Sequence, residues 1–303
     1  MTSREGVYGA PAAALAATAP DAIQLSPFVP GARVIEDLAD GSLDRIVVAA
    51  PAGTLERRYV LAHALRALAP HGALIALAPK DKGGSRLGKE LDGFGCAVNE
   101  TSRRHHRICA VKRPAEPVDL AGAIAAGAPR LVGDLDLWSQ PGLFAWDRLD
   151  PGSALLLASA PVFAGRGADL GCGMGVLARA VLLAPAVTAL TLIDLDRRAI
   201  DAARRNVVDP RASFLQHDLR QPPFTLLDLD FVIMNPPFHE GGGEDKRLGQ
   251  TFIDTAAAML RKGGVCRLVA NIALPYEAAL ERSFATVTPL ARGGGFKVFE
   301  ARR

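Results

Sequence analysis

The feature that most constrains the fold is an alternation of short apolar runs with amphipathic stretches, which begins near residue 165. Buried strands are expected over 167–171, 189–194, 213–217, 231–234 and 265–270. Helices are expected between them, over 176–184, 197–207 and 248–260. Short apolar strands that alternate with helices are typical of a parallel sheet covered on both faces. The sequence therefore predicts a doubly wound α/β domain.

A glycine-rich turn joins the first of these strands to the first helix. An acid, Asp169, precedes three alternating glycines, Gly171, Gly173 and Gly175. Glycine permits a tight turn and the close approach of a ligand, and the helix that follows offers unpaired amides. A related spacing, G-x-G-x-x-G, holds a pyrophosphate in dinucleotide enzymes, but an acid at position 169 would repel one. The pattern favours a cationic ligand, such as the amino group and sulfonium of S-adenosylmethionine.

Acidic residues also follow the next two strands. Asp194 lies 19 residues after Gly175, which is about where an acid bonds ribose hydroxyls in nucleotide-binding folds. Asp196 is expected to cap the helix that starts at residue 197. Asp218 follows the third strand, where its side chain could reach an adenine amino group; the alternative is an ordinary loop acid.

The strand over 231–234 ends in Asn235, Pro236, Pro237 and Phe238. Two prolines make a loop rigid and remove two amide donors. The Asn235 side chain and the Pro236 carbonyl can then accept hydrogen bonds from an exocyclic amine and aim its lone pair. Phe238 offers a face on which a planar base can stack. This pattern predicts a site for a planar nitrogen that is to be methylated, rather than a simple turn.

Residues from about 135 to 303 resemble the class I methyltransferases that act on the exocyclic amine of a base. More narrowly, they resemble the bacterial ribosomal RNA guanine-N2 methyltransferases, including the type that acts on 16S small-subunit rRNA. The stretches that carry the resemblance are 141–153, 169–175, 235–241, 268–276 and 295–299. The family often has His-Asp where this chain has His239 and Glu240, which bears on the substrate more than on the chemistry.

The resemblance implies S-adenosylmethionine as the cofactor. Asp169 and the three glycines of the turn would hold its methionine part, Asp194 its ribose and Asp218 its adenine side. The expected fold is a Rossmann-like, seven-stranded methyltransferase domain preceded by a degenerate, related α/β domain.

The resemblance also implies that Asn235, Pro236 and Phe238 hold a guanine of ribosomal RNA. The reaction would be an in-line displacement, in which the N2 amine attacks the sulfonium methyl group. Proximity and aim would supply most of the catalysis. No general base is expected, and His239 is expected to form a wall of the pocket.

The chain has a seam near residue 115. Pro114 and Pro117 follow a strand-like run and cannot donate hydrogen bonds to a sheet, and an Ala/Gly-rich stretch comes next. We expect a first domain over 1–115, a linker over 116–140 and a catalytic domain over 141–303.

The first domain repeats part of the pattern of the second. A strand, a helix and another strand are expected over 45–50, 55–68 and 73–78. The stretch 68–77 matches 260–269 as helix end, glycine turn and buried strand, but no glycine-rich loop precedes the first copy. We favour a duplicated domain that kept its scaffold and lost its cofactor site, although such turns also occur in unrelated α/β proteins.

Basic residues gather in the segment 80–113. It has nine cations and four acids, a local net charge of +5 against +3 for the whole chain. Flexible basic loops suit contacts to phosphates, although a solvated charged face is the alternative. The residues expected to contact substrate RNA are Lys80, Lys82, Arg86, Arg103, Arg104 and Arg107. The first domain would then present RNA, or the small ribosomal subunit, to the catalytic domain.

Composition excludes several other classes of protein. Hydrophobic residues make up 49% and charged residues 22%, as in ordinary globular proteins. No apolar run reaches the roughly 18 residues of a membrane helix, and the four cysteines form no C-x-x-C pair. We expect a cytoplasmic monomer without a signal peptide, a membrane partner or a metal site.

Three alternatives remain on the sequence alone. Adenine-N6 and protein glutamine-N5 methyltransferases use the same Asn-Pro-Pro-aromatic pattern, more often with Tyr at the position of Phe238. An NAD-dependent oxidoreductase is disfavoured by the glycine spacing and Asp169. A non-enzymatic RNA-binding or ribosome assembly factor is disfavoured by the intact glycine turn together with Asn235.

Overall fold

The computed structural model describes residues 4–221, 226–237, 239–240, 243–244 and 246–303. Contacts divide the chain into two units. The first comprises Met1–Pro129 and Gln140–Gly142, and the second comprises Arg130–Ser139 and Leu143–Arg303. Among the described residues, none of the helices combines the length and the apolar character needed to span a bilayer.

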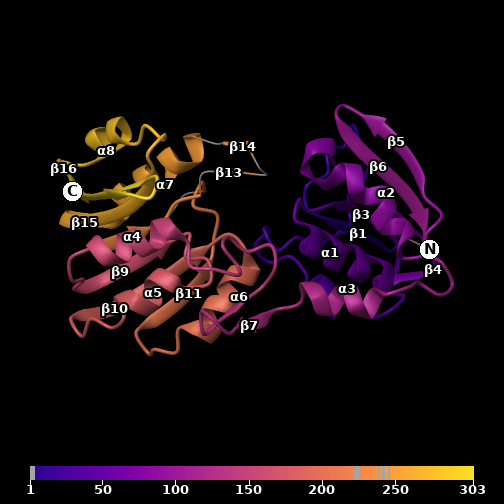
Figure 1. Cartoon of the computed structure of the whole chain (residues 1–303), viewed down its shortest axis with the longest axis horizontal. Helices are drawn as coiled ribbons and strands as arrows, with labels where there is room; N and C mark the ends of the chain where they lie inside the picture. The colour runs from indigo at the N-terminus through magenta and orange to yellow at the C-terminus, as the bar shows by residue number, and fades with distance from the viewer. Residues whose placement is uncertain (1–3, 222–225, 238, 241–242, 245) are drawn as a thin grey trace. The chain divides into compact units, whose positions relative to one another are not determined.

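The second unit contains a seven-stranded sheet (Figure 1). Its strands are β9 Gly165–Leu170, β10 Val187–Asp194, β11 Ala212–Gln216, β12 Leu229–Met234, β15 Leu260–Asn271, β16 Thr286–Gly293 and β17 Phe296–Arg302. Its helices are α4 Pro151–Ser159, α5 Val176–Val181, α6 Arg197–Asn206, α7 Lys246–Met259 and α8 Glu277–Ser283. Two small hairpins accompany them, β7 Arg130–Val132 with β8 Leu137–Ser139, and β13 His239–Glu240 with β14 Gly243–Glu244.

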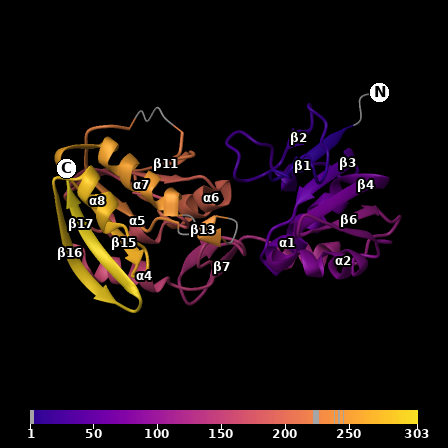
Figure 2. The same cartoon turned by 90° about the horizontal axis from the view of Figure 1, so that it is seen from above.

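The strand order in this sheet is β11-β10-β9-β12-β15-β17-β16. The first five strands are parallel, whereas β17 runs antiparallel to both β15 and β16. Figure 2 shows the β16–β17 hairpin, in yellow, at one edge of the unit. The sequence did not predict this hairpin, because Pro289 interrupts its apolar pattern; a proline is tolerated there because β16 is an edge strand.

Apolar side chains alternate across the sheet and form a core on each face. On β12, Phe231 and Ile233 pack with helices α4, α5 and α6. Val232 and Met234 point the other way and pack with α7 and α8. All four side chains are at most 3% exposed, which explains the continuous apolar run in the sequence. The predicted doubly wound α/β fold is confirmed.

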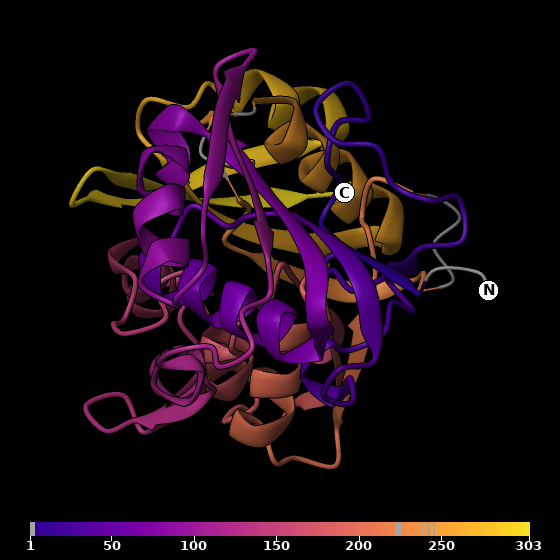
Figure 3. The same ribbon diagram turned by 90° about the vertical axis from the view of Figure 1, so that its right-hand side faces the viewer.

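The first unit contains a six-stranded sheet in the order β2-β1-β3-β4-β6-β5, and Figure 3 shows its indigo and purple strands side by side. The strands are β1 Glu5–Tyr8, β2 Ile23–Gln24, β3 Leu43–Ala49, β4 Leu68–Pro79, β5 Asn99–Arg103 and β6 His106–Lys112. The helices are α1 Thr54–Ala67, α2 Ser85–Asp92 and α3 Leu120–Gly127, with a 3-10 turn at Ile35–Asp37 and a π-helical turn at Lys80–Gly84.

The two sheets follow one plan. Strands β2-β1-β3-β4-β6-β5 have the order and directions of β10-β9-β12-β15-β17-β16. The glycine turns expected at 70–72 and 262–264 lie within β4 and β15, where each strand has a left-handed residue, His71 (φ 63°) and Gly263 (φ 77°). Both positions adjoin an irregular register with the neighbouring strand. The first unit is therefore a related copy of the second.

The first copy is degenerate on one face of its sheet. Helices α1, α2 and α3 contribute to the large core on the other face. No described helix connects β1 to β2, and that second face carries only a small cluster of Ala16, Val47 and Leu77. In the second unit, the matching face holds α5, the helix that follows the glycine turn. The first copy thus lacks the element on which a nucleotide site of this kind is built.

The range expected to be a linker, 116–140, contains regular structure. Helix α3 packs on α1 so closely that a Cβ on Gly127 would lie 2.3 Å from the Cβ of Tyr59. The Gln140 side chain donates to the Gly127 carbonyl at 3.1 Å. Residues up to 129 therefore belong to the first unit, and the hairpin β7–β8 belongs to the second.

Candidate functional site

Three adjacent parallel strands end at one edge of the second sheet. Leu192 of β10 and Ile233 of β12 pair with Asp169 of β9 from either side. The residues at or just after the three strand ends are therefore neighbours, and they include Asp194 and Asn235. After β9 the chain goes to β10 on one side, and later to β12 on the other. Ligands of open α/β sheets bind at such a switch point, beyond the carboxyl ends of the strands.

The glycine turn after β9 depends on backbone conformations that only glycine adopts readily. Gly171, Gly173 and Gly175 have φ values of 71°, 53° and 88°. A Cβ on Gly175 would also lie 2.9 Å from a methyl group of Val207. Among the described residues, no atom outside the turn lies within 4 Å of a Cβ built on Gly173, so these residues leave the middle of the turn open to a ligand.

Asp169 is fully buried at the end of β9. Neither carboxylate oxygen has a hydrogen-bond partner within the part of the chain that the structure describes. Burial and the nearby Asp194 carboxylate raise the pKa of Asp169 to about 8, against a smaller lowering effect of the Ala178 amide. A buried acid without partners costs free energy, and a cationic ligand would remove that cost.

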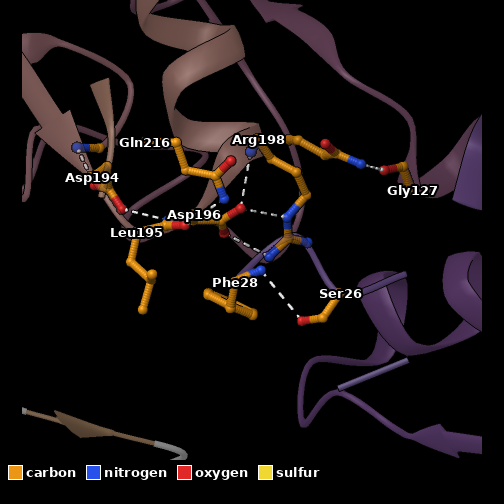
Figure 4. Close-up of polar contacts among 10 residues, drawn as sticks. Ser26, Phe28, Gly127, Asp194, Leu195, Asp196, Arg198 and Gln216 are labelled. Atoms are coloured by element: carbon orange, nitrogen blue, oxygen red, sulfur yellow. Dashed lines mark hydrogen bonds and ion pairs between the residues drawn. The ribbon is translucent and has the colours of Figure 1, made fainter. Parts of the chain in front are cut away.

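Asp194 holds the glycine turn against the end of β10. Its carboxylate accepts the backbone N–H groups of Gly173 and Asp196, both at 2.9 Å; Figure 4 shows the contact between Asp194 and Asp196. Burial raises the pKa of Asp194 to about 6, and the two N–H groups limit that rise. Asp196 caps α6 through the Arg198 N–H and forms a buried ion pair with the Arg198 guanidinium. The expected cap at Asp196 is confirmed.

Asp218 lies at the same edge, because Gln216 at the end of β11 pairs with Asp194. Its two carboxylate oxygens accept from the Arg220 guanidinium at 2.8 and 3.0 Å. Hydrogen bonds from Arg220 hold the pKa of Asp218 below its ordinary value. Gln216 donates instead to the Leu195 carbonyl, at 3.0 Å. Asp218 is therefore close to the site, but in this structure its carboxylate is hydrogen-bonded to Arg220.

Asn235 follows β12 and is fixed through its amide nitrogen. That nitrogen donates to Asp150 and to the Ser153 hydroxyl, each at 2.9 Å. The side-chain oxygen consequently points away from these two acceptors. Pro236 is buried, so the loop after the strand is anchored at its first proline. Phe238 lies outside the described residues.

The sequence reasoning assigned no role to Asp150 and Ser153. Asp150 is the N-cap of α4 and accepts the Ser153 N–H at 2.7 Å, with Pro151 at the first helical position. The run Asp-Pro-Gly-Ser is itself a helix-start signal. The cap could therefore be read from the sequence, whereas its contact with Asn235, 85 residues away, could not.

Asp150→Ala is expected to lower the rate constant for methyl transfer about tenfold, because the Asn235 amide loses an acceptor that orients it. The lost cap should also cost about 0.5–2 kcal/mol of folding stability. Asp150→Asn is the matched control, since its amide oxygen can accept from both Ser153 and Asn235. Single-turnover kinetics and thermal unfolding measure the two effects. Equal rates for all three proteins would contradict the orienting role.

The cations of the first unit gather at one end of its sheet. Lys80 and Lys82 lie in the π-helical turn after β4, and the Lys80 N–H donates to the His105 carbonyl at 2.9 Å. This bond places the turn beside the β5–β6 hairpin tip, which carries Arg103 and Arg104, both exposed. Arg86 is exposed on α2, whereas Arg107 forms an ion pair with Glu100.

The side chains at the carboxyl edge of the second unit's sheet suit an organic cation rather than a metal ion. No group of three or more His, Cys, Asp or Glu side chains within the described ranges is arranged to hold a metal. The four cysteines are free and buried. Asp169 offers a buried carboxyl group that has no hydrogen-bond partner among the described residues, and the open glycine turn offers room for a ligand. These two features fit the methionine part of S-adenosylmethionine.

Comparison with known proteins agrees with this geometry. Residues 134–300 match the family described as "Methyltransferase small domain". A ribosomal RNA small subunit methyltransferase C of Pseudomonas aeruginosa is 35% identical over 253 residues, which cover 81% of this chain and 75% of the relative. The protein of that name from Yersinia enterocolitica is 33% identical over 271 residues, covering 85% and 74%.

A solved structure matches both units of the chain. It is a 16S rRNA N2 methyltransferase of T. thermophilus, in complex with AdoMet and guanosine. The match has a TM-score of 0.73 and 27% identity, and it covers 89% of this chain and 76% of that one.

Proposed function

The chain belongs to the ribosomal RNA small subunit methyltransferase C family, and from that premise we propose that it methylates the exocyclic N2 amine of a guanine in small-subunit ribosomal RNA. The observation that carries this proposal is the juxtaposition of Asp169 and Asn235 at the ends of paired strands. Asp169 would balance the positive charge of the methyl donor, and Asn235 would accept a hydrogen bond from the amine.

We propose that Asp169 and the turn from Gly171 to Gly175 hold the methionine part of S-adenosylmethionine, with Asp194 at the ribose and Asp218 at the adenine side. The cofactor, when bound, supplies an electrophilic methyl group on a sulfonium. Asp169 balances the positive charge of its methionine end. Asp194 already holds Gly173, so the turn is positioned before the cofactor arrives. Asp218 would accept the adenine amine while Arg220 keeps it ionised.

We propose that the Asn235 side-chain oxygen and the Pro236 carbonyl accept the two N2 hydrogens of the guanine. The amine lone pair is then directed along the axis of the displaced bond, and Phe238 is proposed to stack on the base. A bond forms between N2 and the methyl carbon as the sulfur–methyl bond breaks, and the amine proton leaves to solvent. If the guanine is paired in the RNA, it has to be flipped out of its helix to reach Asn235.

Acceptor identity tests this proposal. The protein would be incubated with methyl-labelled S-adenosylmethionine and, in parallel, with small-subunit rRNA, assembled small subunits, adenine-containing DNA and a glutamine-bearing protein substrate. Label is expected only in ribosomal RNA, free or assembled. Label in DNA or protein would replace guanine-N2 chemistry with adenine-N6 or glutamine-N5 chemistry. Absence of transfer to every acceptor, together with absence of S-adenosylmethionine binding, would favour the non-enzymatic assembly factor; absence of transfer with intact cofactor binding would indicate a different acceptor.

We propose that the basic end of the first unit contacts the RNA backbone. Replacing Lys80, Lys82 and Arg86 together with alanine should weaken RNA binding. It should also lower the salt slope by about two, at roughly 0.7–0.9 per phosphate contact. Filter binding across a salt series measures both quantities, and unchanged cofactor affinity is the control. An unaltered salt slope would exclude these residues from the RNA contact.

A further inference from the structure

A cavity in the second unit lies apart from the cofactor and base site. It has a volume of about 510 Å³ and lies between the β7–β8 hairpin and the ends of α5 and α6; strand β8 of this hairpin packs on α6. Its lining includes Leu131, Trp138, Arg179, Leu183, Arg205 and Val208. None of these residues belongs to the site proposed above. The volume falls within the roughly 300–1,000 Å³ of small-molecule sites, so the cavity can hold a nucleotide.

Trp138 is presented in this cavity by a rigid backbone. The backbone N–H of Trp138 donates to the Asn206 side-chain oxygen at 2.7 Å, and the backbone carbonyl of Trp138 accepts from the Asn206 side-chain nitrogen at 2.8 Å. The same nitrogen donates to the Met174 carbonyl in the glycine turn, at 2.8 Å. The residue is nevertheless 36% exposed. A large aromatic held in place and left partly open to solvent is suited to stacking.

Positive charge adjoins the indole. The Arg205 guanidinium lies 4.6 Å from the centre of the Trp138 ring, and no ion pair among the described residues includes Arg205. Arg179 pairs at 3.1 Å with Asp136, which also lines the cavity, but both side chains are largely exposed, so that pair is weak. The other acid of the lining, Asp209, pairs with Arg211 at 2.7 Å, which leaves Arg205 as the cation that no acid of the described residues balances. The local field therefore favours an anionic partner.

We propose that this cavity binds a single-stranded segment of the substrate RNA, with a base stacked on Trp138 and phosphates held by Arg205 and Arg179. Single-strand sites combine aromatic platforms with arginine, and they need no sequence-specific contacts. The aliphatic side chains of Leu131, Leu183 and Val208 at the rim could also contact a protein. The positive charge of Arg205 beside the indole favours RNA instead. The inference rests on the proposed function, because the polyanion is the substrate assigned there.

Tryptophan fluorescence gives a direct test, because the chain has two tryptophans. In full-length Trp146→Phe protein, Trp138 is the remaining reporter. Titration with a short oligouridylate is expected to quench its emission, as stacking on the indole does. In the same background, an unchanged emission at RNA concentrations that saturate the protein would overturn the proposal.

Binding and activity then separate this surface from the catalytic site. Trp138→Ala is expected to weaken rRNA binding about 5- to 100-fold, and Arg205→Gln to lower the salt slope by about one. Cofactor affinity and melting temperature should match those of the wild type. Arg282→Gln, an exposed arginine on α8, is the charge-matched control. If Trp138→Ala and Arg205→Gln both bind RNA as the wild type does, this cavity is not an RNA-binding surface and the proposal is wrong. A wild type that binds RNA but forms no N2-methylguanosine would overturn the proposed function instead.

Discussion

Asn235→Ala is expected to lower the rate constant for methyl transfer by about 10²–10³-fold, the range seen when one polar group that aligns a reacting centre is removed. The reason is geometric. The Asn235 amide is anchored by Asp150 and Ser153, so its oxygen reaches the substrate amine from a fixed direction. Alanine removes that acceptor, so the substrate amine is no longer oriented toward the methyl group. Single-turnover transfer to small-subunit rRNA measures the loss.

The same variant should leave cofactor binding within about threefold of wild type, because the proposed cofactor contacts lie on the glycine turn and on Asp194. Isothermal titration with S-adenosylmethionine provides this control, and thermal unfolding checks the fold. A variant that loses cofactor affinity and rate in equal measure would place Asn235 in the cofactor site. A variant with wild-type rate would remove Asn235 from the mechanism.

Asp169→Asn is expected to have two opposite effects, weaker cofactor binding and a more stable ligand-free protein at alkaline pH. The carboxylate is fully buried and has no hydrogen-bond partner among the described residues. Loss of its charge beside a bound cation should weaken S-adenosylmethionine binding by about 10²-fold or more. Asp201→Asn, on the exposed side of α6, should bind like the wild type. Calorimetric titration compares the three proteins.

The stability effect follows from the raised pKa of Asp169, about 8 against an ordinary 3.8. Below about pH 4 the carboxyl is protonated in both folded and unfolded chains, so it has no differential effect. Between pH 4 and 8 the unfolded chain releases the proton and the folded chain retains it. Folding stability therefore falls as the pH rises, at about 1.4 kcal/mol per pH unit. The Asp169→Asn variant does not lose stability in this way, because asparagine does not ionise. Its buried amide is unsatisfied, however, which lowers the folding stability by about 1–3 kcal/mol at every pH.

Thermal unfolding without cofactor at pH 5 and pH 8 measures this difference. The melting temperature of the wild type should fall more between the two values than that of Asp169→Asn. Cofactor affinity of the wild type should rise with pH up to about 8, because binding a cation requires the ionised acid. An equal pH response of the two proteins would show that Asp169 is already ionised in the ligand-free fold.

Local patterns in the sequence predicted the elements that carry the proposed cofactor site. The strand over 189–194, the helix that begins at residue 197 and the cap at Asp196 all lie where the apolar period and the capping residue indicated. Alternating glycines predicted the turn, and all three adopt positive φ angles. These signals are local, because each depends on residues within one turn of helix or one strand.

Features that depend on distant residues could not be predicted in the same way. The anchoring of Asn235 by Asp150 joins two loops that only the folded sheet brings together. Helix α3, within the range expected to be a linker, is stabilised by packing on α1, and its Ala/Gly-rich sequence carries no amphipathic signal of its own. The pairing of Asp218 with Arg220 is local, but only the structure shows that both carboxylate oxygens are used.

Nucleoside analysis of the methylated RNA tests the central claim most directly. Small-subunit rRNA would be modified with labelled S-adenosylmethionine, digested to nucleosides and separated by liquid chromatography with mass spectrometry against isomeric standards. We expect the label to elute as N2-methylguanosine and to be absent with the Asn235→Ala variant. Label in N1-methylguanosine, N7-methylguanosine or N6-methyladenosine would contradict the assignment of Asn235 to the guanine N2 amine.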